Sequence, residues 1–283
     1  MKFSYLIILL LIAVSCETVV TDDLTISDTT PLLVVEGGIE RYGDSTGVVQ
    51  QVRLTTTNNF LEDAPNPVVE DAQVTISDGP ETYPLTYQGD GVYTTTEVQG
   101  EIGRVYTLEV NWEGAVYRAS DRLTEVPRID SIYADFEEAS IFTDEGYFVK
   151  IDARDPAGVV NFYHYRVYRD NELITVPDPG NSRSLVLDDD FFDGQPRLGF
   201  IPNEEVIYEV GNVAMVDQMG ISEAYFDFLF QVYEQTGSQG GFVGNPPPSS
   251  IRGNVNGISE EAGRALGFFY AADVYRDSIM VVE

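Results

Sequence analysis

Two residue types that carry much of protein chemistry are almost absent: the chain has one cysteine, Cys16, and one histidine, His164. A single thiol cannot form an internal disulfide, and zinc and copper sites normally need several His or Cys ligands. His164 is the only base available to a Ser-His-Asp or Cys-His device, and no Gly-x-Ser-x-Gly elbow accompanies it. These absences exclude a disulfide scaffold and weigh against a zinc or copper enzyme.

Basic residues are also scarce. The 283 residues include 16 Lys or Arg against 47 Asp or Glu, a formal net charge of −31. A polyanion of this size repels nucleic acid and acidic lipid headgroups, so we expect neither as a partner. The acids are mostly dispersed, which is typical of a solvated surface, although they also favour basic ligands or divalent cations. Neither a phosphate-binding loop nor a dinucleotide-binding motif is present, so no cofactor is expected.

Long apolar runs are missing except at the N-terminus, where residues 3–14 follow Lys2. This run is too short to cross a bilayer and has the length of a signal-peptide core. It ends in Ala13-Val14-Ser15-Cys16, which resembles a bacterial lipobox apart from Ala13, where most lipoboxes carry Leu. The pattern predicts a signal peptide over residues 1–15 and lipidation of Cys16. The alternative is that Cys16 is a small buried hydrophobic residue.

Residues 16–30 are polar and lack a sustained period, so they are expected to be a lipidated flexible linker. Glu17, Asp22 and Asp23 resemble signals that send some lipoproteins to the outer face of the outer membrane. The alternative is an ordinary linker, with the protein on the periplasmic face. Either way the sequence predicts a lipid-anchored membrane protein, and the resemblance to these signals implies the outer membrane, preferably facing the cell surface.

From residue 31 to residue 127, short alternating segments are separated by turn signals every 8 to 12 residues. This spacing predicts an antiparallel β-sandwich of the immunoglobulin-like kind. We expect Gly37-Gly38 to end the first strand. Tyr93, Tyr106 and Tyr117 are expected at the edge of the core with their hydroxyl groups on water or backbone, or alternatively as an aromatic platform for a glycan.

Residues 128–283 are expected to form a second β-sandwich, with one helix over residues 222–236. Ser222 is a suitable N-cap, apolar residues follow at helical spacing, and Gly237 is placed to end the helix. A loop rich in Gly and Pro follows over residues 236–257 and is either functional or tightly packed. Strands are expected again over residues 265–270 and 278–282. The fold class predicted for the chain is therefore all-β, with two tandem β-sandwich modules.

One acidic cluster stands out within residues 188–194, Asp-Asp-Asp-Phe-Phe-Asp-Gly. Oxygen ligands this close together suit Ca²⁺, but Phe192 occupies a position where the Asp-x-Asp-x-Asp-Gly loop needs a ligand. We therefore expect a solvated hairpin rather than a metal site, with Ca²⁺ as the alternative. A pair of carboxylates for glycoside hydrolysis cannot be chosen among 47 acids.

Several short segments, in their order along the chain, resemble a family of Bacteroidota lipoproteins catalogued as a domain of unknown function (DUF4249). They are Cys16-Glu17, residues 31–37, residues 69–76, Gly91-Val92-Tyr93, Asp155-Pro156, Asn161-Phe162-Tyr163, residues 189–194, Pro246-Pro247, residues 251–255 and residues 266–269. The resemblance implies two β-rich modules, encoded beside SusC-like TonB-dependent outer-membrane receptors. Gly91-x-Tyr93 and Gly103-x-x-Tyr106 also make the first module similar to transthyretin-like sandwiches.

The family offers no catalytic residues to carry over, so the predicted function is a non-enzymatic accessory lipoprotein of a SusC-like TonB-dependent receptor, in ligand capture or receptor capping. The alternative is a structural or interaction subunit of an envelope assembly, and a weaker alternative is a surface hydrolase. The second module is the expected receptor contact because of its aromatic residues and its long loop. The contact residues suggested there are Phe242, Pro246, Pro247 and Pro248.

Overall fold

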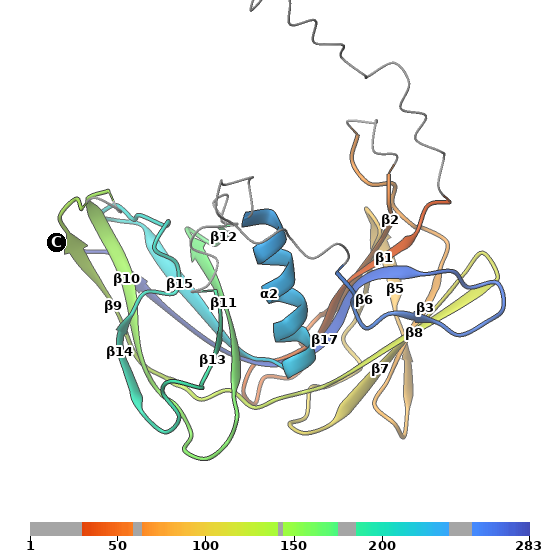
Figure 1. The fold of residues 1–283 in the computed structure, drawn as a ribbon, viewed down its shortest axis with the longest axis horizontal. Helices are drawn as coiled ribbons and strands as arrows, with labels where there is room; N and C mark the ends of the chain where they lie inside the picture. Colours follow the sequence, from red (N-terminus) through yellow and green to blue (C-terminus); the bar gives the residue numbers. More distant parts are fainter. Residues whose placement is uncertain (1–29, 59–63, 141–143, 175–184, 238–250) are drawn as a thin grey trace, which may run out of the picture.

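The computed structural model describes residues 30–58, 64–140, 144–174, 185–237 and 251–283 (Figure 1). The described chain is all-β apart from one helix, α2 (Glu223–Gly237). The strands form sheets of nine, three and five strands. They are β1 (Leu33–Arg41), β2 (Gln50–Thr56), β3 (Gln73–Ser77), β4 (Thr82–Pro84), β5 (Thr86–Gly89), β6 (Val92–Thr95), β7 (Val105–Trp112), β8 (Ala115–Arg122), β9 (Ile129–Glu137), β10 (Gly146–Arg154), β11 (Phe162–Arg169), β12 (Glu172–Leu173), β13 (Val186–Asp188), β14 (Pro196–Phe200), β15 (Val213–Gly220), β16 (Asn256–Gly257) and β17 (Ala265–Met280).

Two sandwiches share the nine-stranded sheet, whose order is β12-β11-β15-β17-β1-β2-β6-β5, with β13 also paired to β11. In the first sandwich the five-stranded sheet β16-β8-β7-β3-β4 packs on the β17-β1-β2-β6 side, around a core that includes Val35, Leu54 and Leu108. In the second, the sheet β14-β10-β9 packs on the β11-β15 side, around a core that includes Ile151 and Val216. The all-β class and the sandwich architecture predicted from the sequence are confirmed.

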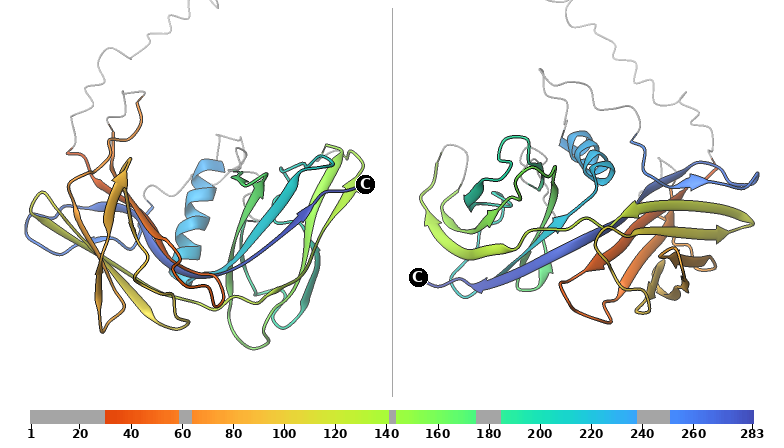
Figure 2. Two further views of the ribbon diagram at one scale, coloured as in Figure 1. Left: turned by 180° about the vertical axis from the view of Figure 1, so that it is seen from behind. Right: turned by 90° about the horizontal axis from the view of Figure 1, so that it is seen from below.

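The long strand β17 joins the two sandwiches, as the views from behind and below show (Figure 2). Its first part pairs in parallel with β1, from Leu33↔Ala265 to Arg41↔Asp273. Its second part pairs antiparallel with β15, from Gly220↔Asp273 to Val213↔Met280. Val255, Ala265 and Phe269 therefore belong to the core of the first sandwich, although they lie far beyond residue 127. The expected boundary at residue 127 marks only the first crossing of the chain between the sandwiches.

Glycines in the central strands do not end them. The expectation that Gly37-Gly38 stops the first strand is wrong, because β1 continues to Arg41. Gly267 likewise lies inside a strand, β17. This strand is continuous from Ala265 to Met280, whereas two strands, over residues 265–270 and 278–282, were expected. Gly267 has φ +86°, and a Cβ there would collide with the carbonyl oxygen of Val35 on the neighbouring strand. These glycines permit the close approach of β1 and β17 and do not act as turn signals.

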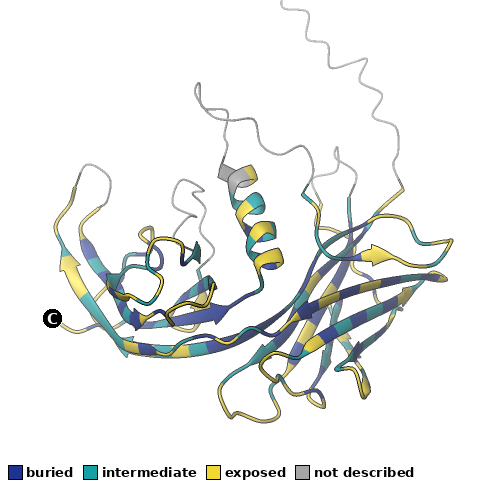
Figure 3. Cartoon of the chain, turned by 60° about the horizontal axis from the view of Figure 1, so that its bottom comes forward, coloured by how far each residue is buried: buried dark blue, intermediate teal, exposed yellow. Residues whose placement is uncertain are grey.

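The helix α2 stands against the outer face of the shared sheet and makes a third apolar cluster there. Ser222 caps it: the Ser222 Oγ accepts a hydrogen bond from the backbone N–H of Tyr225 at 3.2 Å, as predicted. Ile221, Tyr225 and Leu229 are buried against Phe268 and Val274 of β17. The outward side of the helix is exposed, as Figure 3 shows, so α2 is amphipathic. Among the described residues, no helix combines the length and the apolar character that a membrane crossing requires.

Candidate functional site: an aromatic groove beside the helix

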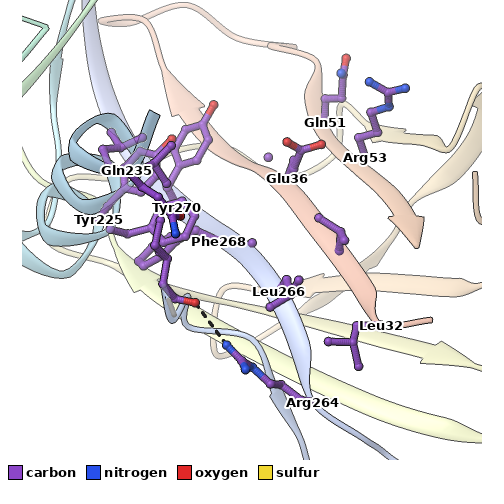
Figure 4. Close-up of a pocket in the computed structure, with 17 residues that line it drawn as sticks. Leu32, Glu36, Gln51, Arg53, Tyr225, Gln235, Arg264, Leu266, Phe268 and Tyr270 are labelled. Atoms are coloured by element: carbon purple, nitrogen blue, oxygen red, sulfur yellow. Dashed lines mark hydrogen bonds between the residues drawn. The ribbon is translucent and has the colours of Figure 1, made fainter. Parts of the chain in front are cut away.

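A groove of about 830 Å³ lies between α2 and the outer face of β1, β2 and β17 (Figure 4). The strand residues in it follow the period of two: on β1, Val34 and Glu36 face the groove while Leu33 and Val35 are buried in the first sandwich. The described lining residues are Leu32, Val34, Glu36, Gly37, Gln51, Arg53, Tyr225, Phe228, Leu229, Val232, Gln235, Ile251, Arg264, Leu266, Gly267, Phe268 and Tyr270.

Aromatic rings form the wall where the helix meets the sheet. The ring of Tyr225 is stacked on that of Tyr270, with centroids 4.7 Å apart and planes at 6°. Phe228 lies 5.2 Å from Phe268, and Tyr225 lies 4.9 Å from the same ring. Tyr225 and Phe268 are buried, whereas Phe228 and Tyr270 are partly exposed. The groove therefore presents partly exposed rings that are held in place by buried rings.

The rim of the groove is polar. Glu36 on β1 and Gln51 and Arg53 on β2 are exposed, and Arg264 is exposed just before β17. Figure 4 shows Glu36, Gln51 and Arg53 on neighbouring strands at one side, with Arg264 at the other end near Leu266. Partly exposed rings and aliphatic groups at the centre, with donors and acceptors at the edge, suit a ligand that has a flat apolar face and polar margins.

A buried ionic network lies behind the wall. Tyr270 donates a hydrogen bond to Glu40 at 2.6 Å, and Arg166 of β11 donates to the same carboxylate at 2.7 Å. Burial disfavours the charge on Glu40, but the charge of Arg166 and the hydrogen bonds from Arg166, Tyr270 and Tyr42 outweigh it and lower the pKa of Glu40. Burial, followed by the charge of Glu40, raises the pKa of Tyr270. An ionised Glu40 thus holds a neutral Tyr270 in position against Tyr225.

A second, smaller cavity of about 260 Å³ lies beside this network and is lined by Glu40, Gln50, Arg166 and Tyr270 among others. Gln50 is fixed from both ends, since its Oε1 accepts from the backbone N–H of Glu40 at 2.8 Å and its Nε2 donates to the carbonyl of Glu40 at 2.9 Å. Glu40, Gln50, Arg166 and Tyr270 already have partners within the protein. This arrangement supports the wall of the larger groove.

The site residues suggested by the sequence lie mostly outside the described residues. Cys16 is in residues 1–29, and the suggested contacts Phe242, Pro246, Pro247 and Pro248 are in residues 238–250. Gln235 and Ile251, which flank the latter segment in the sequence, both line the groove. The lipid anchor and these contacts therefore stay predictions.

The three tyrosines of the first sandwich belong to its core. Tyr93, Tyr106 and Tyr117 are 2%, 0% and 6% exposed. Tyr93 donates to the carbonyl of Val69 at 3.1 Å, and Tyr106 donates to the carbonyl of Gln99 at 2.6 Å. The core interpretation is confirmed, and the alternative of a glycan platform at these residues is excluded by their burial.

The acidic cluster 188–193 is only partly solvated. Asp190 is exposed, as a solvated hairpin requires, but Asp189 is 3% exposed. Burial, and then the neighbouring charges of Asp155 and Asp193, raise the pKa of Asp189, while a hydrogen bond from the backbone of Asn161 opposes this. The expectation of a simple solvated hairpin is therefore wrong for Asp189.

Sequence reasoning found the helix side of the groove but missed the strand side. The spacing of Tyr225, Phe228 and Val232 marks an apolar face, and all three line the groove. Val34 and Leu266 lie in segments for which the sequence predicted only strands. Their pairing, Val34↔Leu266, is a contact between distant parts of the chain that no local pattern reveals.

Comparison with known proteins gives one result of substance. No curated protein matches the chain. The profile of one family matches residues 19–278 of the 283. This match covers both sandwiches, α2 and the shared strand β17 up to Ser278. The chain therefore belongs to the family described as a domain of unknown function (DUF4249).

Proposed function

We propose that this chain is a non-enzymatic, lipid-anchored outer-membrane protein that captures a ligand as an accessory to a SusC-like TonB-dependent receptor. The observation that carries the proposal is the groove beside α2, which combines partly exposed rings with a polar rim. Binding sites for small ligands are concave, mostly apolar, and carry a few placed polar groups. The groove has this composition, with Phe228 and Leu266 at its centre and Arg53 and Arg264 at its rim.

The anchor is supported by the sequence. The apolar run before Cys16 has the length of a signal-peptide core, and the small residues before the thiol suit lipoprotein processing. Several acyl chains hold a protein on a membrane far more firmly than a single chain does. The outer membrane, with the protein facing the cell surface, is the proposed location, on the basis of Glu17, Asp22 and Asp23. These features suit a protein that works beside an integral membrane partner.

A surface for such a partner is supported by exposed apolar side chains in the second sandwich. Val160 on the β10–β11 turn is 69% exposed, and Phe191 on the β13–β14 turn is 91% exposed. These turns are hydrogen-bonded to each other, since the N–H of Gly158 donates to Asp193 at 2.6 Å. Exposed apolar groups gathered in one place mark interaction sites. We propose this surface as a receptor contact, in addition to the suggested Phe242, Pro246, Pro247 and Pro248.

The test is a gentle-detergent pull-down of the tagged lipoprotein from its native membrane, followed by mass spectrometry. We expect recovery of a TonB-dependent receptor in stoichiometric amount. Recovery of the lipoprotein alone, with its exposure and stability unchanged when the receptor gene beside its own is deleted, would contradict the proposal. Recovery of other envelope proteins in place of a receptor would favour the structural alternative.

Two variants sharpen this test. Cys16→Ala is expected to release soluble, unacylated protein with an intact fold, and labelling with an alkynyl fatty acid reports the acylation directly. Phe191→Ser is expected to reduce receptor recovery several-fold, whereas the control Phe136→Ser changes a phenylalanine on β9 that is 54% exposed. Label that persists on Cys16→Ala would refute the anchor, and equal recovery with the two serine variants would refute the contact surface.

A further inference from the structure

Two turns of the second sandwich are joined by hydrogen bonds to acidic side chains. The turns are residues 155–161, between β10 and β11, and residues 189–195, between β13 and β14. The N–H of Gly194 donates to Asp155 Oδ2 at 3.0 Å, and the N–H of Asn161 donates to Asp189 Oδ2 at 2.9 Å. Each turn thus supplies a carboxylate that accepts a hydrogen bond from the backbone of the other turn.

Three carboxylates converge where the turns meet. Oxygen atoms of Asp155, Asp189 and Asp193 lie within 4.8 Å of one another. Asp155 is 2% exposed and Asp189 is 3% exposed. Among the described residues, none of the three forms an ion pair with a basic side chain. Like charges this close and this buried repel, and either a proton or a cation among them relieves the repulsion.

A neutral oxygen adjoins the same place. Asn161 is 5% exposed, and its Oδ1 is buried without a hydrogen-bond partner. The backbone N–H of Asn161 donates to Asp189 Oδ2, so the side-chain amide of the same residue lies beside the carboxylates. A buried carbonyl oxygen without a partner is rare in folded proteins, and a bound ion is one of its ordinary explanations. Asn161 Oδ1 therefore supplies an observation independent of the carboxylates.

We propose that Asp155, Asp189, Asp193 and Asn161 bind a divalent cation, Ca²⁺. All four residues offer hard oxygen ligands, which suit Ca²⁺ and do not suit zinc or copper. Ca²⁺ accepts six to eight oxygens in variable geometry, and the exposed Asp193 leaves room for water to complete the shell. The ion neutralises the buried carboxylates and cross-links the two turns.

The proposed ligands explain why the acidic run 188–194 does not match a single-loop Ca²⁺ motif. Phe192, which breaks the Asp-x-Asp-x-Asp-Gly pattern, is not needed as a ligand. Its ring is stacked on that of Tyr163 at 6.4 Å, and the guanidinium of Arg197 lies 4.9 Å from it. Asp155 and Asn161 come instead from a turn more than 25 residues earlier in the sequence. The site is built from two turns, not from one loop.

Terbium luminescence tests the site directly on the full-length chain in detergent, after removal of bound ions with EDTA. The Tyr163 hydroxyl donates to Asp155 at 2.5 Å, so tyrosine can sensitise Tb³⁺ bound there. We expect Tb³⁺ emission, its displacement by Ca²⁺, and a rise in melting temperature with Ca²⁺. The absence of emission together with an unchanged melting temperature up to about 10 mM Ca²⁺, above the range of extracellular calcium modules, would overturn the proposal.

Two asparagine variants of the same acidic run give a matched comparison. Asp193→Asn removes the negative charge of the exposed ligand and keeps its shape, so it is expected to fold as the wild type does in EDTA and to lose at least tenfold in Ca²⁺ affinity. Asp190→Asn changes an exposed acid outside the ligand set and is expected to bind as the wild type does. Equal affinities for the two variants would overturn the assignment, because the binding would then reflect acidity of the turn alone.

Discussion

The two sandwiches differ in the burial and in the hydrogen-bond partners of their polar side chains. In the first, buried tyrosines such as Tyr106 bond to backbone carbonyls, and the ion pair Arg118–Glu109 is exposed, with side chains 52% and 44% accessible. In the second, Asp217 is fully buried and Arg197 is 8% exposed. The second sandwich therefore buries arginine and aspartate side chains that contact each other, whereas the pair Arg118–Glu109 of the first stays in water.

The charged network of the second sandwich also reaches the first. Asp217 on β15 accepts hydrogen bonds from Arg276 at 2.5 Å and from Arg166 at 2.8 Å. Arg166 continues to Glu40 on β1, and Glu40 holds Tyr270 in the groove wall. The charged network of the second sandwich therefore also supports the candidate site. A change in its charges is expected to alter the position of Tyr270 in the groove wall.

The largest expected effect is that of Asp217→Ala. It leaves two arginines without their buried partner, and we expect the free energy of unfolding to fall by about 3 kcal/mol. The matched change in the first sandwich, Glu109→Ala, removes half of an exposed pair and is expected to cost no more than about 0.5 kcal/mol. Urea unfolding measures both, and similar losses for the two variants would break the comparison.

A smaller effect is expected for Tyr106→Phe in the first sandwich. The hydroxyl accepts from the N–H of Glu101 at 2.8 Å and donates to the carbonyl of Gln99, so its loss leaves two partly buried backbone groups unpaired. We expect a loss of about 1 to 2 kcal/mol in the free energy of unfolding. Tyr83→Phe is the control, because the Tyr83 hydroxyl contacts only the acidic side chains of Glu81 and Asp78. An unchanged free energy of unfolding in Tyr106→Phe would show that the hydrogen bonds of this tyrosine to the backbone do not stabilise the first sandwich.

The smallest effect concerns His164 and pH. Burial, followed by the charge of Arg166, lowers the pKa of His164 to about 3. The unfolded chain takes up a proton near pH 6.5 and the folded chain does not, so stability falls as the pH drops. Between pH 7 and pH 5.5 we expect a loss on the order of 1 kcal/mol that His164→Gln lacks. Proton NMR of the single imidazole gives the pKa, and an ordinary value would contradict the burial of His164 beside Arg166.

The sequence predicted those features that local patterns determine. The helix was found because Ser222 and the spacing of Tyr225 and Leu229 act within a few residues of each other. The length of β17 was missed at residues 271–277, where no strand was expected and where pairing with β1 and then β15 carries the strand through. The groove, and the place of Asp155 and Asn161 beside the acidic run 188–194, were missed for the same reason. Their residues come from strands and turns that are far apart in the chain.

The central claim is that the groove beside α2 holds a ligand. Native mass spectrometry of the protein released from its own membrane in gentle detergent tests it, with two matched Phe→Ala changes on the same helix. Phe228 lines the groove, whereas Phe230 packs on Phe226 with ring centroids 6.0 Å apart. We predict a bound mass, beyond detergent and acyl chains, on the wild type and Phe230→Ala that is lost from Phe228→Ala. No such mass on the wild type, or its equal retention by Phe228→Ala, would contradict the claim.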